Sequence, residues 1–438
     1  MPPYGTRSTC SKRFADRTVG GRQQGDSVTE IKTDRSKKVR IPRAVYVLGA
    51  TIFVLGTTEF ILAGLLPEVA EDFQVSLPRA GLLISAFAVA MVVGAPLLTV
   101  ATLRLPRRAT LLGALVLFIG GQVLGALAPD YATLLVARIV TAAATGAFWA
   151  VAGVFAVNTV DPAHRARALS LLLGGLTTAN VLGVPLGTLI GQQWGWRATF
   201  WVIGAAAALA AVGIRLSLPG HRGSDPAPAG IRAELGAFTS GRLWLAFGTT
   251  AVFEAGVMGM FSYLAPVVTD VAGLPTGAVP LVLTLYGLGS LVGVQLGGRL
   301  ADAYPWATLY LSLGVLVLVL AAVAAASSAP WVLLAGAFVL GVAVFVAATP
   351  LNARVFALAG PAPTLASASN ASAFNVGNTI GPWLGGLVIS AGFGFRMPSA
   401  VAAVLVGGAL GLGLLSRALD ARVARREVSA VEAMACRT

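Results

Sequence analysis

The sequence contains few of the residues that build disulfide frameworks or metal sites. Its 438 residues include two cysteines, Cys10 and Cys436, and two histidines, His164 and His221. The cysteines stand near opposite ends of the chain, and both histidines lie in predicted loops. These residues alone cannot form a disulfide framework or a cluster of metal ligands. We therefore expect no metal and no cofactor.

Charged residues are scarce as well. Asp, Glu, Lys and Arg make up 11% of the chain, and hydrophobic residues make up 56%. Soluble domains carry about 25% charged residues. A soluble fold with so few charges would expose large apolar patches to water. The composition therefore excludes an ordinary soluble protein and predicts a chain that lies in a lipid bilayer.

The common signatures of enzymes and ATP-driven machines are missing too. The sequence has no G-x-x-x-x-G-K-[ST] phosphate-binding loop, which excludes ATP-driven transport within this chain. It has no G-x-S-x-G elbow and no zinc signature. An integral membrane enzyme should also show clustered His or Asp at a membrane face, and no such cluster is visible. We predict that the protein is not an enzyme.

Long apolar runs are what the sequence does have. A membrane-spanning helix needs about 20 predominantly apolar residues, and twelve such runs can be placed along the chain. An all-α membrane protein is the predicted fold class. The runs lie near residues 44–66, 80–102, 108–128, 132–157, 168–191, 199–218, 243–268, 279–298, 308–326, 331–353, 366–391 and 397–416.

The basic residues predict the orientation of these spans. The net charge is +13, but the Lys and Arg residues lie between apolar runs and in the tails rather than in one patch, so we expect no nucleic-acid partner. With the N-terminus in the cytoplasm, cytoplasmic segments hold 27 of them, outer segments hold three, and Arg138 lies within a span. This asymmetry is typical of an even number of spans with both termini in the cytoplasm.

Two polar segments divide the chain. The first 43 residues contain 11 Lys and Arg against 4 Asp and Glu and lack the apolar core of a secretory signal, so a disordered basic cytoplasmic tail is expected. A polar stretch rich in proline and glycine follows the sixth span and predicts a linker. The expected domains are a tail (1–43), a six-helix bundle (44–218), a cytoplasmic linker (219–242), a second six-helix bundle (243–416) and a cytoplasmic tail (417–438).

The two predicted bundles repeat each other. Pro67 and Pro266 are 199 positions apart (266 − 67), and Pro185 and Pro382 are 197 apart (382 − 185), in similar local sequences. Repeated halves of this kind place a substrate cavity at the interface between them. The repeat therefore favours a transporter made of two pseudo-symmetric six-helix bundles.

Three stretches carry a family resemblance: GTTEFILAGLLPEVAEDFQVS (56–76), ARIVTAAATGAF (137–148) and GVPLGTLIGQQWGWRATFW (183–201). With these stretches, residues 44–416 resemble the major facilitator superfamily, in particular its twelve-span drug:proton antiporters. The chain is most similar to the bacterial chloramphenicol exporters and the related sugar-efflux permeases. The resemblance implies the two-bundle fold, proton-coupled export and a monomeric protein of the cell inner or plasma membrane.

The family's conformational motifs are only partly present. The pattern G-x-L-A-D-x-x-G-R-R is expected after span two, but Thr99 and Leu103 replace its Gly and Asp in the first half. The antiporter-type pattern in span five takes the variant form GVPLG (183–187), which we interpret as a helix-packing element. The motif residues retained are Arg104, Arg107, Arg108, Gly183, Pro185, Gly187, Gly298 and Asp302.

Three charged residues stand within apolar spans, where each costs a few kcal/mol and calls for a partner or a role. Glu59 in span one and Arg138 in span four are expected at similar depth, and a pair between them would offset the burial of both charges. Glu254 lies near the middle of span seven with no evident basic mate. We predict that Glu59 and Glu254 bind protons or substrate and that Arg138 modulates Glu59. A static buried ion pair is the alternative for Glu59 and Arg138.

Aromatic and amide side chains could complete an apolar cavity with a few polar contacts, the usual character of a small-molecule site. Lipid contact or core packing is the alternative reading for each aromatic residue. The candidate cavity residues are Phe60, Phe148, Trp149, Asn180, Phe253, Phe261, Tyr263, Asn375 and Asn378.

The sequence thus predicts a proton-coupled efflux transporter whose partners are a small molecule, protons and the lipid bilayer. The cavity spans look rich in aromatic residues, which favours chloramphenicol as substrate and antibiotic resistance as outcome. A sugar or nucleoside efflux permease of the same superfamily is the main alternative. A non-transporting membrane receptor is a remote one.

Overall fold

The computed structural model describes residues 42–102, 105–161, 165–218, 240–359 and 363–435. Within these ranges the chain is helical and contains no strand. Residues Ile41–Arg417 form one compact body. Most of the expected N-terminal tail (1–43) and of the expected linker (219–242) lies outside the described residues.

The first half of this body, here the N-half, comprises the helices that precede residue 219. They are α2 (Arg43–Asp72), α3 (Leu77–Thr102), α4 (Arg107–Ala126), α5 (Tyr131–Asn158), α6 (Arg165–Thr178), the π-helical turn η2 (Ala179–Gly183), α7 (Val184–Trp194) and α8 (Trp196–Ser217).

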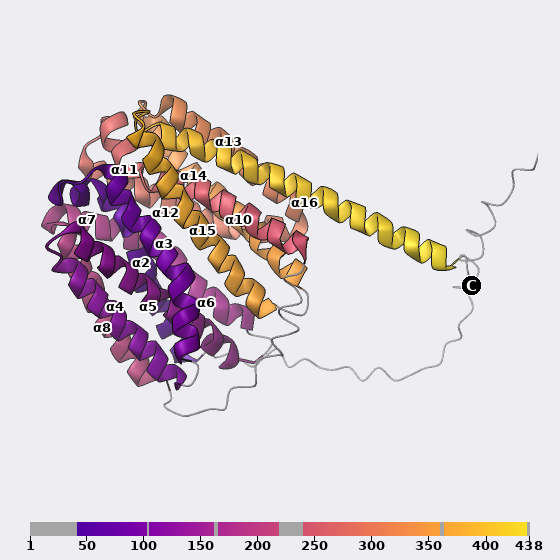
Figure 1. Ribbon diagram of the computed structural model, residues 1–438, viewed down its shortest axis with the longest axis horizontal. Coiled ribbons are helices and arrows are strands. Elements are labelled where there is room, and N and C mark those ends of the chain that lie inside the picture. Colours follow the sequence, from indigo (N-terminus) through magenta and orange to yellow (C-terminus); the bar gives the residue numbers. More distant parts are fainter. Residues whose placement is uncertain (1–41, 103–104, 162–164, 219–239, 360–362, 436–438) are drawn as a thin grey trace, which may run out of the picture. The chain divides into compact units, whose positions relative to one another are not determined.

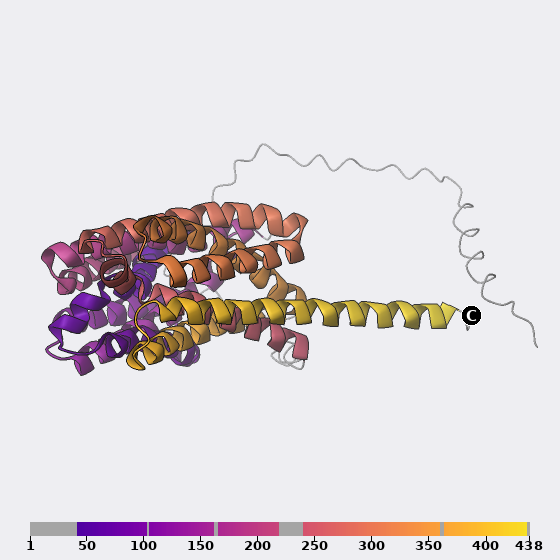
Figure 2. The same ribbon diagram turned by 90° about the horizontal axis from the view of Figure 1, so that it is seen from above.

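The second half, here the C-half, follows residue 239. Its helices are α10 (Gly241–Phe261), α11 (Leu264–Pro266), η4 (Val267–Val271), η5 (Thr276–Ala278), α12 (Val279–Ala303), α13 (Pro305–Ala326), α14 (Pro330–Ala359), α15 (Pro363–Ser390) and α16 (Met397–Ala435). The N-half is coloured indigo to magenta and the C-half salmon to yellow in Figure 1. The view from above shows their helices running in a common direction (Figure 2).

Among the described helices, eleven are long and apolar enough to cross a membrane. The continuous run α6–η2–α7 counts as one of them. The twelfth span is α15, which has 28 residues but carries Asn370, Asn375 and Asn378 together with several Ser, Thr and Gly residues. A helix as polar as α15 is suited to the interior of a bundle rather than to lipid. The predicted all-α fold of twelve helices in two bundles is confirmed.

The outside of the body is apolar. Leucine and valine side chains on α8, α13 and α16 are 70–81% exposed, among them Leu209, Leu216, Leu318 and Val404. In water such a surface would be a liability, whereas lipid tails solvate it. The surface therefore agrees with a body that is surrounded by lipid. Beyond residue 416, where the last span was expected to end, α16 continues as helix to Ala435.

Glycines four residues apart hold the innermost helices close together. In the N-half, Gly187 and its neighbours at 183 and 191 face α2, where a Cβ on Gly187 would touch Ile61. In the C-half, Gly381 and its neighbours at 377 and 385 face α10, where a Cβ on Gly381 would strike the carbonyl of Ala255. Small residues permit such close approach of helices in membranes.

The two halves touch near the end of the bundle that holds the turn 73–76, here called the closed end. The Ser85 hydroxyl of α3 donates a hydrogen bond to the Thr379 carbonyl of α15 (2.9 Å). The Gln192 amide of α7 donates to the Thr276 carbonyl of η5 (3.1 Å). The Tyr263 ring packs against Gly81 across the same boundary. These contacts join the two halves on the closed-end side of the candidate site.

Candidate functional site

A small cavity lies between the halves. From the N-half it is lined by Glu59 and Phe60 of α2 and by three residues of α3, and from the C-half by Met258 and Asn378. The volume of this cavity is about 10 Å³, which is room for one water molecule. Drug-sized ligands occupy sites of roughly 300–1,000 Å³. A substrate would therefore need the halves to move apart.

Arg138 of α5 is fully buried beside this cavity. Its Nη1 donates a hydrogen bond to the Thr58 carbonyl (2.8 Å), and its guanidinium carbon lies 4.1 Å from the centre of the Phe87 ring. Its Nε and Nη2 have no hydrogen-bond partner among the described residues. The structure thus places Arg138 against the residue that precedes Glu59 and against an aromatic ring that favours a cation.

Glu59 is partly exposed and interacts electrostatically with Arg138. The two side chains form no direct ion pair in the structure as described. Arg138 is held instead by the backbone of the α2 turn that carries Glu59. The sequence-based expectation that the two charges lie at similar depth agrees with this arrangement, and a contact through the Thr58 carbonyl takes the place of a carboxylate–guanidinium bond.

Glu254 of α10 is buried, with 8% of its surface exposed. It interacts electrostatically with Glu59 of the other half and with Tyr286 of α12. Within the described ranges no Lys or Arg forms an ion pair with it. The structure therefore brings the three charged residues predicted from the sequence into one neighbourhood that spans both halves.

Aromatic rings join the halves next to these charges. Phe60 meets Phe261 edge to face with their centres 6.4 Å apart, and Phe261 lies 4.9 Å from Tyr286. The first of these contacts crosses between the halves. The cavity thus has aromatic and apolar walls, two carboxylates nearby and one amide, Asn378, whose Oδ1 is buried without a hydrogen-bond partner among the described residues.

The other predicted cavity residues lie elsewhere. Phe148 and Phe253 are fully buried in the core, and Trp149 packs against it. Tyr263 is fully buried at the closed end, where its hydroxyl donates to the Pro382 carbonyl (2.8 Å). None of these four lines the cavity that contains Glu59. Their predicted contact with substrate therefore has no support in this conformation.

Two more amides were predicted to reach the substrate. Asn375 Nδ2 donates to the Ala371 carbonyl of its own helix (3.0 Å). Asn180 lies in the π-helical turn η2, and a Cβ on Gly287 of α12 would meet its backbone carbonyl. Neither lines the cavity. Asn180 instead marks where span five contacts the C-half.

The motif residues have mainly packing positions. Gly183, Pro185 and Gly187 are buried where span five packs on α2, with Pro185 two residues after the end of the π-helical turn. Arg108 donates to the Arg215 carbonyl (2.7 Å), linking the ends of α4 and α8. The packing interpretation of span five agrees with these contacts.

Four motif residues remain near the loops that follow spans two and eight. Arg104 lies outside the described residues, and Arg107 is partly buried at the start of α4. No side chain lies within reach of a Cβ on Gly298, and Asp302 is exposed near the end of α12 without an ion pair among described residues. Among the residues that the structure describes, Asp302 has no partner that could serve as a gate.

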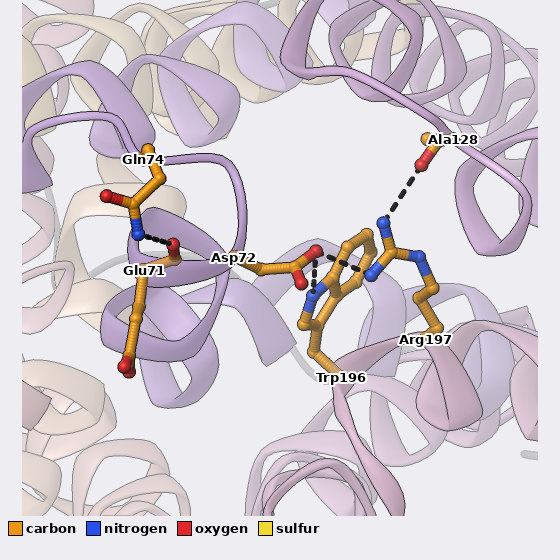
Figure 3. Close-up of polar contacts among 6 residues, drawn as sticks. All are labelled: Glu71, Asp72, Gln74, Ala128, Trp196 and Arg197. Atoms are coloured by element: carbon orange, nitrogen blue, oxygen red, sulfur yellow. Dashed lines mark hydrogen bonds and ion pairs between the residues drawn. The ribbon is translucent and has the colours of Figure 1, made fainter.

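A polar cluster lies at the closed end of the N-half (Figure 3). The Asp72 carboxylate accepts hydrogen bonds from Arg197 (2.5 Å) and from the Trp196 indole (3.2 Å). Arg197 also donates to the Ala128 carbonyl (3.0 Å). The cluster ties the ends of α2 and α4 to the start of α8.

Several residues of the site were not predicted from the sequence. Met258 lines the cavity, and Tyr286 packs against Phe261. Phe87 also lines the cavity, and the Arg138 guanidinium lies over its ring. Gln122 of α4 is buried and donates to the Thr58 hydroxyl (2.8 Å). Gln122 is a polar side chain inside an apolar run, a signal that could have found it.

The sequence profile of the Major Facilitator Superfamily matches residues 48–370, and these residues carry both halves of the site. The chain belongs to the major facilitator superfamily. Members of this superfamily are transporters, which bind small-molecule substrates in a membrane. The predicted family is confirmed.

Two relatives and one solved structure are similar to this chain. The chain is 38% identical over 344 residues to the chloramphenicol resistance protein of Streptomyces lividans, covering 78% of this chain and 88% of that protein. It is 36% identical over 380 residues to the inner membrane transport protein YdhP of Escherichia coli K12, covering 86% and 96%. The crystal structure of a bacterial homolog of the human lysosomal transporter Spinster, inward-facing and unoccupied, shares the fold with a TM-score of 0.67 at 17% identity, covering 86% and 98%.

Proposed function

We propose that this transporter is a proton-coupled exporter of a small molecule, with chloramphenicol as the favoured substrate and antibiotic resistance as the outcome. One observation supports the coupling most. Glu59 and Glu254 come from opposite halves and interact with each other beside the cavity, with Arg138 next to Glu59 only. Charged groups in spans are costly and mark proton or substrate paths.

Two carboxylates within electrostatic range repel each other when both are ionised. A proton on either of them removes this repulsion between the halves. Arg138 is held by the turn that carries Glu59, so that proton release from Glu59 leaves a negative charge with a cation nearby. Protonation thereby changes the free energy of bringing the halves together, and a transporter needs such a change to couple protons to a conformational cycle.

The proposed orientation places both termini in the cytoplasm, as the loop charges predict. The closed end, where Ser85 bonds to Thr379 and Gln192 to Thr276, then faces the outside. Export from this state begins with entry of substrate from the cytoplasm. The functional unit is a monomer of two six-helix bundles (44–218 and 243–416), joined by a cytoplasmic linker (219–242) and flanked by two cytoplasmic tails (1–43 and 417–438).

The cavity wall favours an aromatic, weakly polar substrate. Phe60 and Phe87 line the cavity and offer stacking surface, and Asn378 offers an amide. Phe261 packs against Phe60, and Tyr286 packs against Phe261. The similarity to a chloramphenicol resistance protein supports the same substrate class. A sugar or nucleoside would require more hydroxyl partners than this wall supplies, so sugar or nucleoside export is the second candidate.

The test is export of labelled chloramphenicol from cells that express the protein, with and without a protonophore. We expect lower accumulation than in empty cells, and we expect the protonophore to abolish the difference. Equal accumulation in expressing and empty cells would reject the substrate. Export that persists with the protonophore would reject the coupling. Labelled sugars and nucleosides in the same assay test the second candidate.

A further inference from the structure

Thr58 connects two buried polar side chains from different helices. Its carbonyl accepts a hydrogen bond from Arg138 of α5 (2.8 Å), and its hydroxyl accepts one from Gln122 of α4 (2.8 Å). Gln122 is 1% exposed and Arg138 is 0% exposed. Spans one, three and four are thus joined at the residue immediately before Glu59.

Gln122 and Arg138 also have polar atoms that are complementary in hydrogen bonding. Gln122 Oε1 is a buried acceptor without a hydrogen-bond partner among the described residues. Nε and Nη2 of Arg138 are buried donors that likewise have no partner among these residues. Close packing keeps the groups near each other, since a Cβ on Gly121 would touch Thr141 and lie 3.3 Å from the Ala137 carbonyl. Burying a polar atom without a hydrogen-bond partner is unfavourable, so the arrangement is held by surrounding packing.

From this geometry we infer that Gln122 is a positioning residue for Arg138. The Gln122 amide fixes the Thr58 hydroxyl and with it the α2 turn whose carbonyl holds the guanidinium. Arg138 thereby stays directed at the turn that carries Glu59. Loss of the amide frees this turn and weakens the electrostatic support that Arg138 gives to the Glu59 carboxylate.

The charged and titratable groups around Arg138 can be named helix by helix. Glu59 of α2 interacts electrostatically with Arg138 without a direct ion pair, and Glu254 of α10 interacts electrostatically with Glu59. Tyr286 of α12 interacts in turn with Glu254. Phe87 of α3 adds only its ring face, and α4 contributes the uncharged Gln122. Gln122 carries no charge, so it acts on Glu59 through the position of the Thr58 turn and of Arg138.

The experiment measures the protonation of Glu59 without transport. Dicyclohexylcarbodiimide reacts with protonated buried carboxyls, so mass spectrometry of purified protein gives the labelling rate of Glu59 against pH. The variants are Gln122→Met, Thr58→Val and the double variant. Thr58→Ser, which keeps the hydroxyl, is the rescue. Thr51→Val is the matched control, because the Thr51 hydroxyl donates to the Val47 carbonyl of its own helix and has no other partner among the described residues.

For Gln122→Met and Thr58→Val we expect roughly three- to tenfold faster labelling of Glu59 at neutral pH, equivalent to about half to one pH unit. The plateau reached at low pH stays unchanged. The double variant shows no larger effect because both changes break the same bond. Thr58→Ser and Thr51→Val behave as the parent.

Either of two results overturns the inference. The first is a parent-like profile in Gln122→Met or, if that variant does not accumulate, in Thr58→Val, which removes a single hydroxyl. The second is a changed low-pH plateau alone, which reports access of the reagent rather than protonation. The inference rests on the proposed role of Glu59 as the proton carrier, yet labelling does not depend on export. Displaced labelling in a protein whose export ignores protons would reject the proposed function and leave the positioning role intact.

Discussion

Gly94 of α3 packs against Ala143 of α5 in the N-half, and 199 positions later Gly293 of α12 packs against Val342 of α14 in the C-half. The two inner helix pairs therefore use the same register (293 − 94 and 342 − 143). The repeat found in the sequence is thus a repeat of packing. Differences between the halves at this spacing are differences in side chains on one shared scaffold.

The decisive difference concerns charge. The same spacing relates Phe87 to Tyr286 and Arg138 to Ala337. The N-half places a guanidinium over a ring next to Glu59, whereas the C-half has a buried alanine and a phenol near Glu254. One acid has a permanent cation beside it, and the other faces a phenol and the first acid. The two carboxylates should therefore contribute unequally to proton coupling.

The largest effect should come from the acid that has the cation. Glu59→Gln removes the charge that Arg138 compensates, and we expect proton-driven export to fall at least about tenfold, about 1.4 kcal/mol or more at 25 °C. Export by inverted vesicles under an imposed pH gradient measures this. Glu71→Gln, at an exposed acid of the same helix, is the control and should export normally. Normal export by Glu59→Gln at parental abundance contradicts the proposed role.

The charged core of this site could be predicted from the sequence because charge is rare in apolar runs. Glu59, Arg138 and Glu254 each stand out against the composition of their spans, and the structure brings them together. The repeat and the loop charges likewise supplied the two-bundle fold. These are signals of composition, which do not depend on the rotation of a helix about its axis.

The cavity walls depend on that rotation and were only partly predictable. Phe60 and Phe148 look alike in sequence, yet Phe60 lines the cavity and Phe148 lies in the core. Tyr286 and Met258 were missed because an aromatic or apolar residue in an apolar helix can equally face lipid, core or cavity. Only the packing of neighbouring helices decides among these, and the pattern of one sequence does not contain it.

The second-largest effect should come from Glu254, the acid that has no cation beside it. For Glu254→Gln we expect roughly a fivefold loss of proton-driven export, about 1 kcal/mol, because no compensated charge is disturbed. The same vesicle assay gives the ratio of the two losses. Tyr286→Phe, which removes only the phenol oxygen, should lie between Glu254→Gln and the parent. A loss of export for Glu254→Gln that equals or exceeds that of Glu59→Gln would show that Arg138 does not determine which carboxylate contributes more.

The glycine seams give a stability comparison of the halves. A Cβ on Gly381 would strike the backbone of Ala255 and Gly259, whereas one on Gly187 would meet the flexible end of Ile61. Because a side chain can yield and a backbone cannot, Gly381→Ala should cost about 1–3 kcal/mol and Gly187→Ala less. Thermal unfolding of both variants in detergent measures the difference. Equal losses of stability would mean that the contact of Gly187 with α2 and that of Gly381 with α10 tolerate an added methyl group equally well.

The smallest effect is expected at the rim of the N-half. Arg197 bonds to Asp72, while Arg396, 199 positions later, forms no ion pair among the described residues. The Arg197 and Asp72 side chains are 38% and 41% exposed, and exposed pairs contribute about 0.2–1 kcal/mol. Asp72→Asn should therefore lower the unfolding temperature slightly, and added salt should reduce the difference. Arg396→Gln is the counterpart in the C-half and should change nothing. A loss in Asp72→Asn that salt does not change would instead point to the Trp196 indole bond, because its donor is uncharged and the bond depends less on salt than an ion pair does.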